Sequence, residues 1–180
     1  LKGELEEQGK VITSVKDGDD EAFQNNMENC LNKPLNQFGD ISIVAETLEQ
    51  ISIRLFRNGV TFLNKLKDEV LKISESFRVK NKEEAFKEFV AYVDGLQSIF
   101  ELVDVLIKNP QLDFLGTVDE GRTGEVIVKD FTTLNKEVLK AQEGDDVILL
   151  ADLLEYELSP ALANLAGLLE VVAETATKKE

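Results

Sequence analysis

Apolar residues recur at steps of three and four over most of the chain after Thr47, which is the spacing of amphipathic helices. The clearest case is the stretch 82–108, where one row follows these steps throughout: Phe86, Phe89, Val93, Leu96, Phe100, Val103 and Ile107. A second row repeats every seven residues beside the first: Ala85, Tyr92, Ile99 and Leu106. Two adjacent rows make a wide apolar face, so we expect a central bundle helix that contacts two or more neighbours and ends at Asn109-Pro110.

Two further long helices are expected around this one. A row with steps of three, four and four predicts a nearly straight helix from Thr47 with an eleven-residue period: Leu48, Ile51, Leu55, Gly59, Phe62, Leu66, Val70, Ile73 and Phe77. Gly59 in this row indicates a packing glycine or a hinge. Another helix is predicted over 125–142, along Ile127, Phe131, Leu134, Val138 and Ala141. Residues 111–124 are expected to form a loop whose apolar residues cover one end of the bundle: Leu112, Phe114 and Leu115.

The last helix is predicted over 145–172, capped by Asp145 or Asp146, with a leucine-rich stripe: Val147, Leu150, Leu154, Leu158, Ala161, Leu165, Leu168 and Val172. On the opposite face the same spacing places Asp152, Glu155 and Ser159, with Tyr156 beside them. Pro160 lacks an N–H, so we expect a kink near Ser159 that leaves the Tyr156 carbonyl without its usual partner. One interpretation is a core helix with a solvated acidic back. The other is a partner or ligand surface formed by Asp152, Glu155, Tyr156 and Pro160.

The first 46 residues carry a different pattern. Residues 11–16 and 41–46 alternate with period two, as half-buried strands do, and the residues between them have helical spacing at Phe23, Met27, Cys30 and Leu31. We interpret this region as a small β-α-β module, which a third strand preceding Leu1 would complete. Alternatively, the strands pack on the helices or pair with another molecule. The predicted fold is therefore α+β, mostly α: a module over 1–46 followed by an antiparallel four-helix bundle over 47–180.

Charge is uneven along the chain. Twenty Lys and Arg stand against thirty-five Asp and Glu, and the resulting net charge of −15 argues against nucleic acid or an anionic membrane as partner. Residues 54–87 contain nine basic and five acidic residues, a net charge of +4. Residues 141–177 contain eight acidic and no basic residues, a net charge of −8. We expect these two segments to lie side by side in the bundle or to meet across a dimer interface.

Several chemistries are excluded by residue type. The chain has no histidine and one cysteine, which rules out Ser-His-Asp catalysis, histidine metal sites and structural zinc sites. No phosphate-binding glycine loop is present, and the Gly-Arg-Thr-Gly string at 121–124 is interpreted as a turn before a helix. We therefore predict no cofactor and no metal. Catalysis by carboxylates alone, with Asp152 and Glu155, stays open.

Location follows from the same composition. No run of about eighteen apolar residues occurs, so no transmembrane segment is expected, and no secretory signal is visible. Cys30 has no partner for an internal disulfide, which indicates a reducing compartment and a cytoplasmic protein. Because the chain starts at Leu1 rather than Met, we expect that further residues preceded it in the gene product.

The string DDVILLADLLEYELSP, at 145–160, resembles a segment of uncharacterised bacterial proteins that end in a leucine-rich helical bundle. The resemblance implies a bundle and no particular activity. In layout, several long antiparallel helices with a wide apolar groove, the chain is similar to bacterial flagellar export chaperones.

These observations predict a non-enzymatic, cytoplasmic helical-bundle protein of adaptor or chaperone-like type. It would bind a protein partner, accepting an amphipathic helix in its groove, or would form a homo-oligomer. The alternative is a small enzyme or ligand-binding protein with a carboxylate site near the Pro160 kink.

Overall fold

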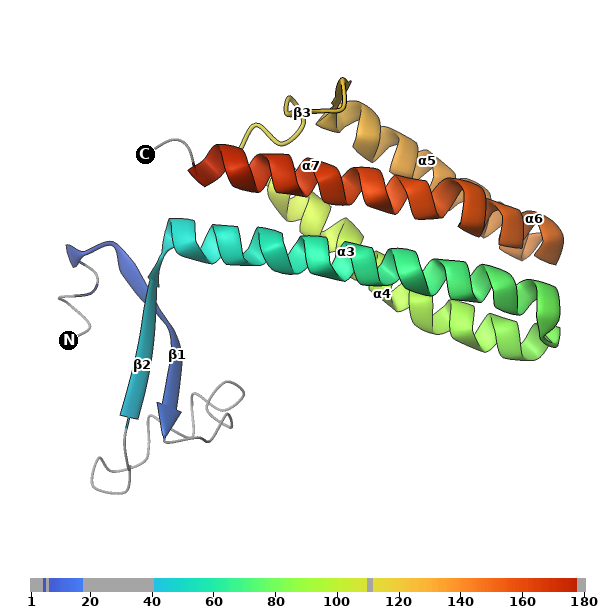
Figure 1. The fold of residues 1–180 in the computed structure, drawn as a ribbon, viewed down its shortest axis with the longest axis horizontal. Coiled ribbons are helices and arrows are strands. Elements are labelled where there is room, and N and C mark those ends of the chain that lie inside the picture. The colour runs from blue at the N-terminus through green and yellow to red at the C-terminus, as the bar shows by residue number, and fades with distance from the viewer. Residues whose placement is uncertain (1–4, 6, 18–40, 110–111, 178–180) are drawn as a thin grey trace. The chain divides into compact units, whose positions relative to one another are not determined.

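The computed structural model describes residues 5, 7–17, 41–109 and 112–177 of the chain (Figure 1). The fold is α+β and mostly α. The chain divides into two compact units, Leu1–Ile53 and Arg54–Glu180, which are described separately below.

The first unit contains two strands, β1 (Lys10–Asp17) and β2 (Ile41–Thr47). They pair antiparallel, with Lys10 opposite Thr47, and the register shifts between Ile12 and Ser14. β1 and β2 are therefore not the parallel pair of a β-α-β unit. Period-two alternation occurs in both parallel and antiparallel strands and does not specify strand direction. The helix predicted around Met27 lies outside the described residues.

Helix α3 (Leu48–Val79) follows β2 directly. Thr47, at the predicted start of the helix, is its N-cap residue. The Gln50 N–H donates to Thr47 Oγ1 at 3.1 Å, and the Thr47 N–H donates to Gln50 Oε1 at 3.0 Å. This reciprocal pair satisfies donors that the first turn of a helix otherwise leaves free.

The second unit holds most of the helical structure (Figure 1). Helix α3 turns at residues 80–81 into α4 (Lys82–Lys108), which has the predicted bounds. Helix α5 (Gly124–Glu143) is followed by three helical segments that run end to end: α6 (Val147–Asp152), the π-helix η3 (Leu153–Leu158) and α7 (Ser159–Thr177). No helix in the described part of the chain has the length and apolarity needed to cross a membrane.

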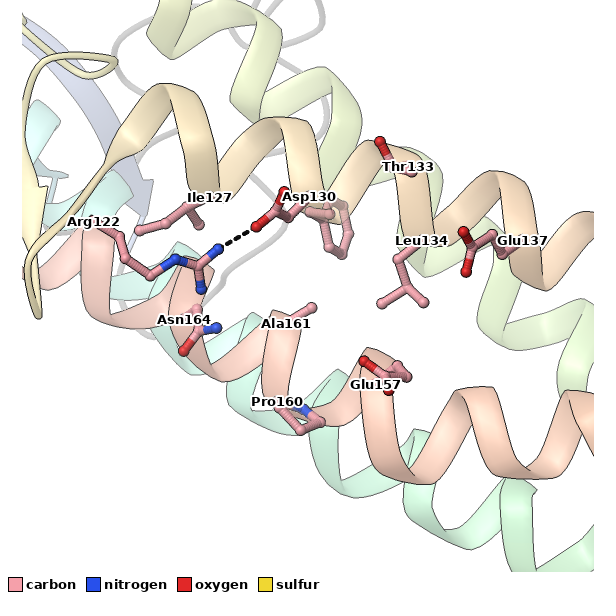
Figure 2. A pocket seen from close by; sticks show the side chains of 11 residues that line it. Arg122, Ile127, Asp130, Thr133, Leu134, Glu137, Glu157, Pro160, Ala161 and Asn164 are labelled. Carbon is pink, nitrogen blue, oxygen red and sulfur yellow. Dashed lines mark hydrogen bonds and ion pairs between the residues drawn. The ribbon is translucent and has the colours of Figure 1, made fainter.

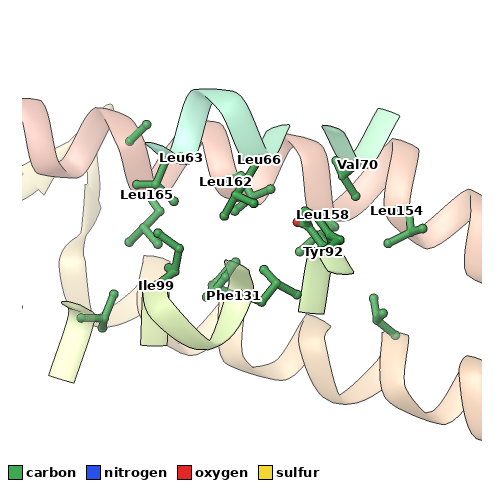
Figure 3. Packing of buried hydrophobic residues seen from close by; sticks show 14 of the residues in the cluster. Leu63, Leu66, Val70, Tyr92, Ile99, Phe131, Leu154, Leu158, Leu162 and Leu165 are labelled. Atoms are coloured by element: carbon green, nitrogen blue, oxygen red, sulfur yellow. The ribbon is translucent and has the colours of Figure 1, made fainter. Parts of the chain in front are cut away.

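One hydrophobic core joins these helices. Figure 3 shows side chains from α3, α4, α5, η3 and α7 meeting in it, among them Leu66, Ile99, Phe131, Leu158 and Leu162. Leucines of η3 and α7 supply many of its fully buried members. The leucine-rich stripe therefore faces the core, as its spacing predicted.

The buried stripe of α3 differs from the predicted one. Its buried residues alternate steps of three and four without interruption: Phe56, Gly59, Leu63, Leu66, Val70, Ile73 and Phe77. This is a seven-residue period, not an eleven-residue one, and Leu55 is 52% exposed. A Cβ on Gly59 would lie 3.1 Å from a methyl of Leu102 and 3.2 Å from one of Leu169, so Gly59 is a packing glycine.

The buried face of α4 is also rotated from the expected one. Every member of the second row is buried, together with three residues of the first row: Phe89, Leu96 and Val103. Two members of the first row, Val93 and Ile107, are 42% and 41% exposed, while Phe86 and Phe100 are half-buried. The apolar face of α4 is therefore wider than the core covers.

The segment between α4 and α5 is not only a loop. Its strands β3 (Val118–Asp119) and β4 (Arg122–Thr123) pair antiparallel across Glu120 and Gly121, whose φ angles of 45° and 79° suit a tight hairpin turn. Phe114 is buried in the core, and Leu112 and Leu115 pack against it as expected. Thr123 caps α5, so the Gly-Arg-Thr-Gly string is the predicted turn before a helix.

Pro160 directly follows the π-helix η3 and Ser159, and the sequence did not predict this π-helix. The Ser159 N–H donates to the Leu154 carbonyl, five residues back, in place of the usual four. This wider turn changes the phase of the helix, and Ser159 is buried, not exposed beside Asp152 and Glu155. At the start of the segment Asp146 is the predicted cap, accepting from the Leu149 N–H at 3.0 Å.

Candidate functional site

The predicted surface of Asp152, Glu155 and Tyr156 lies beside the C-terminal end of α3, where Arg78 contacts all three. The Arg78 Nη2 donates to Asp152 Oδ1 at 2.8 Å, and its Nη1 donates to Glu155 Oε2. The guanidinium carbon lies 5.9 Å from the centre of the Tyr156 ring, within range of a cation–π contact. One cation therefore joins three of the four predicted site residues.

Ser74 connects this group to the core. Its hydroxyl donates to the buried Ala151 carbonyl at 2.9 Å and accepts from Arg78 Nη1 at 3.0 Å. Hydrogen bonding from Arg78 lowers the pKa of Glu155. Hydrogen bonds to Glu155 and then Asp152 raise the pKa of Arg78. The carboxylates of Asp152 and Glu155 are therefore already paired with Arg78, so they stabilise the contact between α3 and the α6–η3 segment and are not free to bind a ligand.

A second ion pair, between Lys82 and Asp145, links the start of α4 to the residues before α6. Arg78 and Lys82 come from the basic segment 54–87, and Asp145, Asp152 and Glu155 come from the acidic segment 141–177. The two segments are therefore paired within one chain.

Pro160 is on another side of the helix. It lines a pocket of about 330 Å³ between α5 and the η3–α7 segment, shown in Figure 2. Glu157, Pro160, Ala161 and Asn164 line one side, at the i, i+3, i+4, i+7 spacing of a single helix face. Glu157 is on this side of the helix, while Glu155, two residues earlier, faces Arg78.

The opposite wall of this pocket comes from α5 and from Arg122 of β4. Ile127, Phe131 and Leu134 form an apolar floor. Arg122 Nη2 is paired with Asp130 at 2.5 Å, as the dashed line in Figure 2 marks. Glu137 and Glu157 have no hydrogen bond or ion pair to any described residue. Glu137 and Arg122 were not predicted as site residues, because their place in one pocket depends on how α5, β4 and the η3–α7 segment pack together.

A larger and more apolar groove lies on the other side of α5, against α4. Its volume is about 410 Å³, and its floor contains Phe89, Leu96, Phe100 and Val138. Val93 on α4 and Leu139 on α5 line it while 42% and 51% exposed. Its polar lining side chains are Gln97, Thr132, Asn135, Lys136 and Gln142. The groove uses the part of the wide α4 face that the core leaves uncovered.

Neither hollow has the character of a metal site. Within residues 5, 7–17, 41–109 and 112–177, no three Asp, Glu, Cys or His side chains gather closely enough to hold a metal ion. The groove between α4 and α5 provides an apolar surface for contact. The pocket beside Pro160 provides the carboxylates of Glu137 and Glu157 above an apolar floor.

The chain was compared with known families, curated proteins and solved structures. Neither the curated proteins nor the solved structures contain a match to this chain. Residues 54–167 match the model of a family described as Domain of unknown function (DUF8042), a span that runs from α3 into α7 and covers both hollows. Since the match covers more than half of the sequence, the chain belongs to the DUF8042 family.

Proposed function

We propose that this DUF8042 protein is a non-enzymatic binding protein that accepts an amphipathic helix of a protein partner in the groove between α4 and α5. In this proposal α3, α4, α5 and the α6–η3–α7 segment form an antiparallel four-helix bundle, and the groove is its binding surface. The observation that carries the proposal is the apolar groove with partly exposed Val93 and Leu139 in its lining.

Burial of apolar surface favours this occupant. A helix with apolar residues at i, i+3, i+4 and i+7 presents a stripe that fits a trough between two helices. Each Å² of apolar surface removed from water contributes roughly 25 cal/mol, so covering Val93, Phe100 and Leu139 supplies a favourable driving force. Exposed apolar patches lined by polar residues commonly mark such interaction sites.

The cytoplasmic location belongs to the same proposal. It is supported by the single cysteine, Cys30, since a lone cysteine suits a reducing compartment. A second copy of the chain is the competing occupant of the groove, and the test below separates it from a partner.

The test uses the full chain and a designed helical peptide with a leucine stripe at i, i+3, i+4 and i+7. Binding is measured by fluorescence anisotropy, and the site by NMR shifts of the Val93 and Leu139 methyl groups. We expect Leu139→Lys to weaken binding by about tenfold or more, because it places a charge in the groove. The matched control is Ile148→Lys on α6, where an apolar side chain is 74% exposed outside the groove.

Two results would count against the proposal. One is a peptide that binds wild type and Leu139→Lys equally; the other is the absence of any shift in the groove methyl groups at saturating peptide. Light scattering on the same variants tests for the competing occupant. If the chain is a dimer, and Leu139→Lys dissociates the dimer while Ile148→Lys does not, the occupant of the groove is a second copy of the chain.

A second candidate function, a small enzyme or ligand-binding protein with a carboxylate site near Pro160, is favoured by the pocket in Figure 2. Its carboxylates would be Glu137 and Glu157, because Asp152 and Glu155 are paired with Arg78. The probe is 1,4-diaminobutane, whose alkyl chain suits the apolar floor. The proposal is supported if this probe raises the melting temperature of wild type and of Glu170→Gln, a control at an exposed position of α7, but not that of Glu157→Gln. An unchanged melting temperature of wild type argues against it.

A further inference from the structure

We infer that the groove between α4 and α5 sets the direction of the helix it accepts, because its two walls carry opposite charges. The favoured partner helix has basic side chains along one edge of its apolar stripe and acidic side chains along the other. This inference rests on the proposed function and adds to it the chemistry of the partner.

The α4 wall is acidic alongside the groove. Asp94 and Glu101 are exposed, seven residues apart, and therefore point the same way from the helix. Gln97, which lines the groove between them, donates to Glu101 Oε1 at 3.3 Å. Neither carboxylate forms an ion pair with any residue that the structure describes.

The α5 wall is basic over the same length. Lys129, Lys136 and Lys140 are exposed and occupy positions i, i+7 and i+11, which share one side of the helix. Lys136 itself lines the groove. None of the three has an ion-pair partner among the described residues.

The two walls do not neutralise one another, because the apolar lining of Val93, Phe100 and Leu139 lies between them. A helix seated on that lining would present one edge to each wall, as the flanking positions of a coiled coil do. Basic residues on the edge of the bound helix that faces α4 would then pair with Asp94 and Glu101. Acidic residues on the other edge would pair with the lysines of α5. Each exposed pair of this kind is weak, so the preference for one peptide over another comes from several pairs acting together along both walls.

Direction follows from geometry. Turning a helix end for end while its apolar face stays on the groove exchanges its two edges. A helix with one basic and one acidic edge therefore satisfies both walls in one direction only, and exchanging the charges of its edges reverses that direction.

The experiment uses four designed peptides with the same leucine stripe: two split-edge peptides with exchanged edges, one with both edges basic and one with both edges acidic. Affinities to the full chain are measured at low salt, where surface charges are least screened. We expect both split-edge peptides to bind about five- to tenfold more tightly than the two uniform ones. A spin label on one peptide end should broaden the Leu139 methyl signals for one split-edge peptide. For the other it should broaden the signals of Val128, a half-buried residue eleven positions nearer the start of α5.

A variant with two substitutions tests the walls directly. Asp94→Lys with Glu101→Lys makes both walls basic, so the uniformly acidic peptide should become the tightest binder. The control, Glu75→Lys with Glu170→Lys, makes the same change in net charge at exposed positions outside the groove.

The outcomes separate the two proposals. If no peptide binds in the groove, the proposed function and this inference both fail. If all four peptides bind there with equal affinity, or both split-edge peptides give the same broadening, the groove is a docking site without a direction and only this inference fails.

Discussion

Arg78 and Asp152 lie 74 residues apart in sequence and 2.8 Å apart in space, and the same guanidinium also donates to Glu155. This one side chain fastens the end of α3 to the junction of α6 and η3. We expect Arg78→Gln to lower the melting temperature, because it leaves two carboxylates close together without their cation. The loss should be smaller than for a truncated core leucine, since the group is partly exposed.

The contact also predicts a pH dependence. Hydrogen bonding from Arg78 lowers the pKa of Glu155 in the folded chain below its unfolded value of about 4.3. The stability it contributes is therefore present above that pH and is lost as the pH falls through the folded pKa. Urea unfolding from pH 7 down to pH 3 should show the gap between wild type and Arg78→Gln closing. A gap of constant size would mean that the pair contributes nothing through charge.

Leu158 ends the π-helical segment and is fully buried in the core. Leu158→Ala should lower the free energy of unfolding by about 2–5 kcal/mol, because it removes apolar contacts and leaves a cavity. Ile148→Ala is the matched comparison, since this side chain is 74% exposed and its loss should change stability by less than about 0.5 kcal/mol. Chemical denaturation of both variants measures the difference, and similar losses would contradict the packing in Figure 3.

Gly124 at the start of α5 leaves no room for a side chain. A Cβ there would lie 2.1 Å from the Phe114 carbonyl oxygen, so the backbone itself would have to move. We expect Gly124→Ala to destabilise the protein by roughly 1–3 kcal/mol and to speed amide exchange at Gly124 and Glu125, whose N–H groups bond the preceding loop. Glu125→Ala, at the exposed neighbouring position, should leave stability nearly unchanged.

Tyr92 is 2% exposed, and its hydroxyl has no hydrogen-bond partner among the described residues. Tyr92→Phe should therefore raise the free energy of unfolding by about 1 kcal/mol, because a buried unsatisfied hydroxyl is costly. Burial also raises the pKa of Tyr92, so above about pH 10 the unfolded chain loses this proton first and stability falls as pH rises.

The Tyr92→Phe variant should show a weaker loss of stability between pH 10 and pH 11 than wild type, measured by urea unfolding. Reduced stability of the variant at pH 7 would show instead that the hydroxyl makes a favourable bond in solution.

Part of this structure could be predicted from local pattern. The bounds of α4, the caps at Thr47 and Asp146, and the inward stripe of Leu154, Leu158 and Leu165 all depend on residues within a few turns of each other. Helical periodicity and capping act over that range, so the sequence alone is sufficient for them.

The candidate sites needed the tertiary structure. Both rows of α4 are apolar along the sequence, and only the packing of its neighbours determines that Tyr92 is buried while Val93 lines the groove. In the same way, opposite segment charges predicted that the basic and acidic helices pair, but not that Arg78 is the residue that reaches Asp152.

The π-turn before Pro160 is the clearest case of a feature that the sequence predicts only in part. The sequence by itself determined that Pro160 interrupts the regular helix, because proline has no N–H to donate. The helix can adapt to the proline by a kink or by a π-turn, and the choice depends on which leucines pack into the core. In this structure a π-turn forms and Leu154 and Leu158 are fully buried. The tertiary structure therefore decided that Glu155 faces Arg78 and Glu157 faces α5, since burial of the leucines sets the phase of the helix.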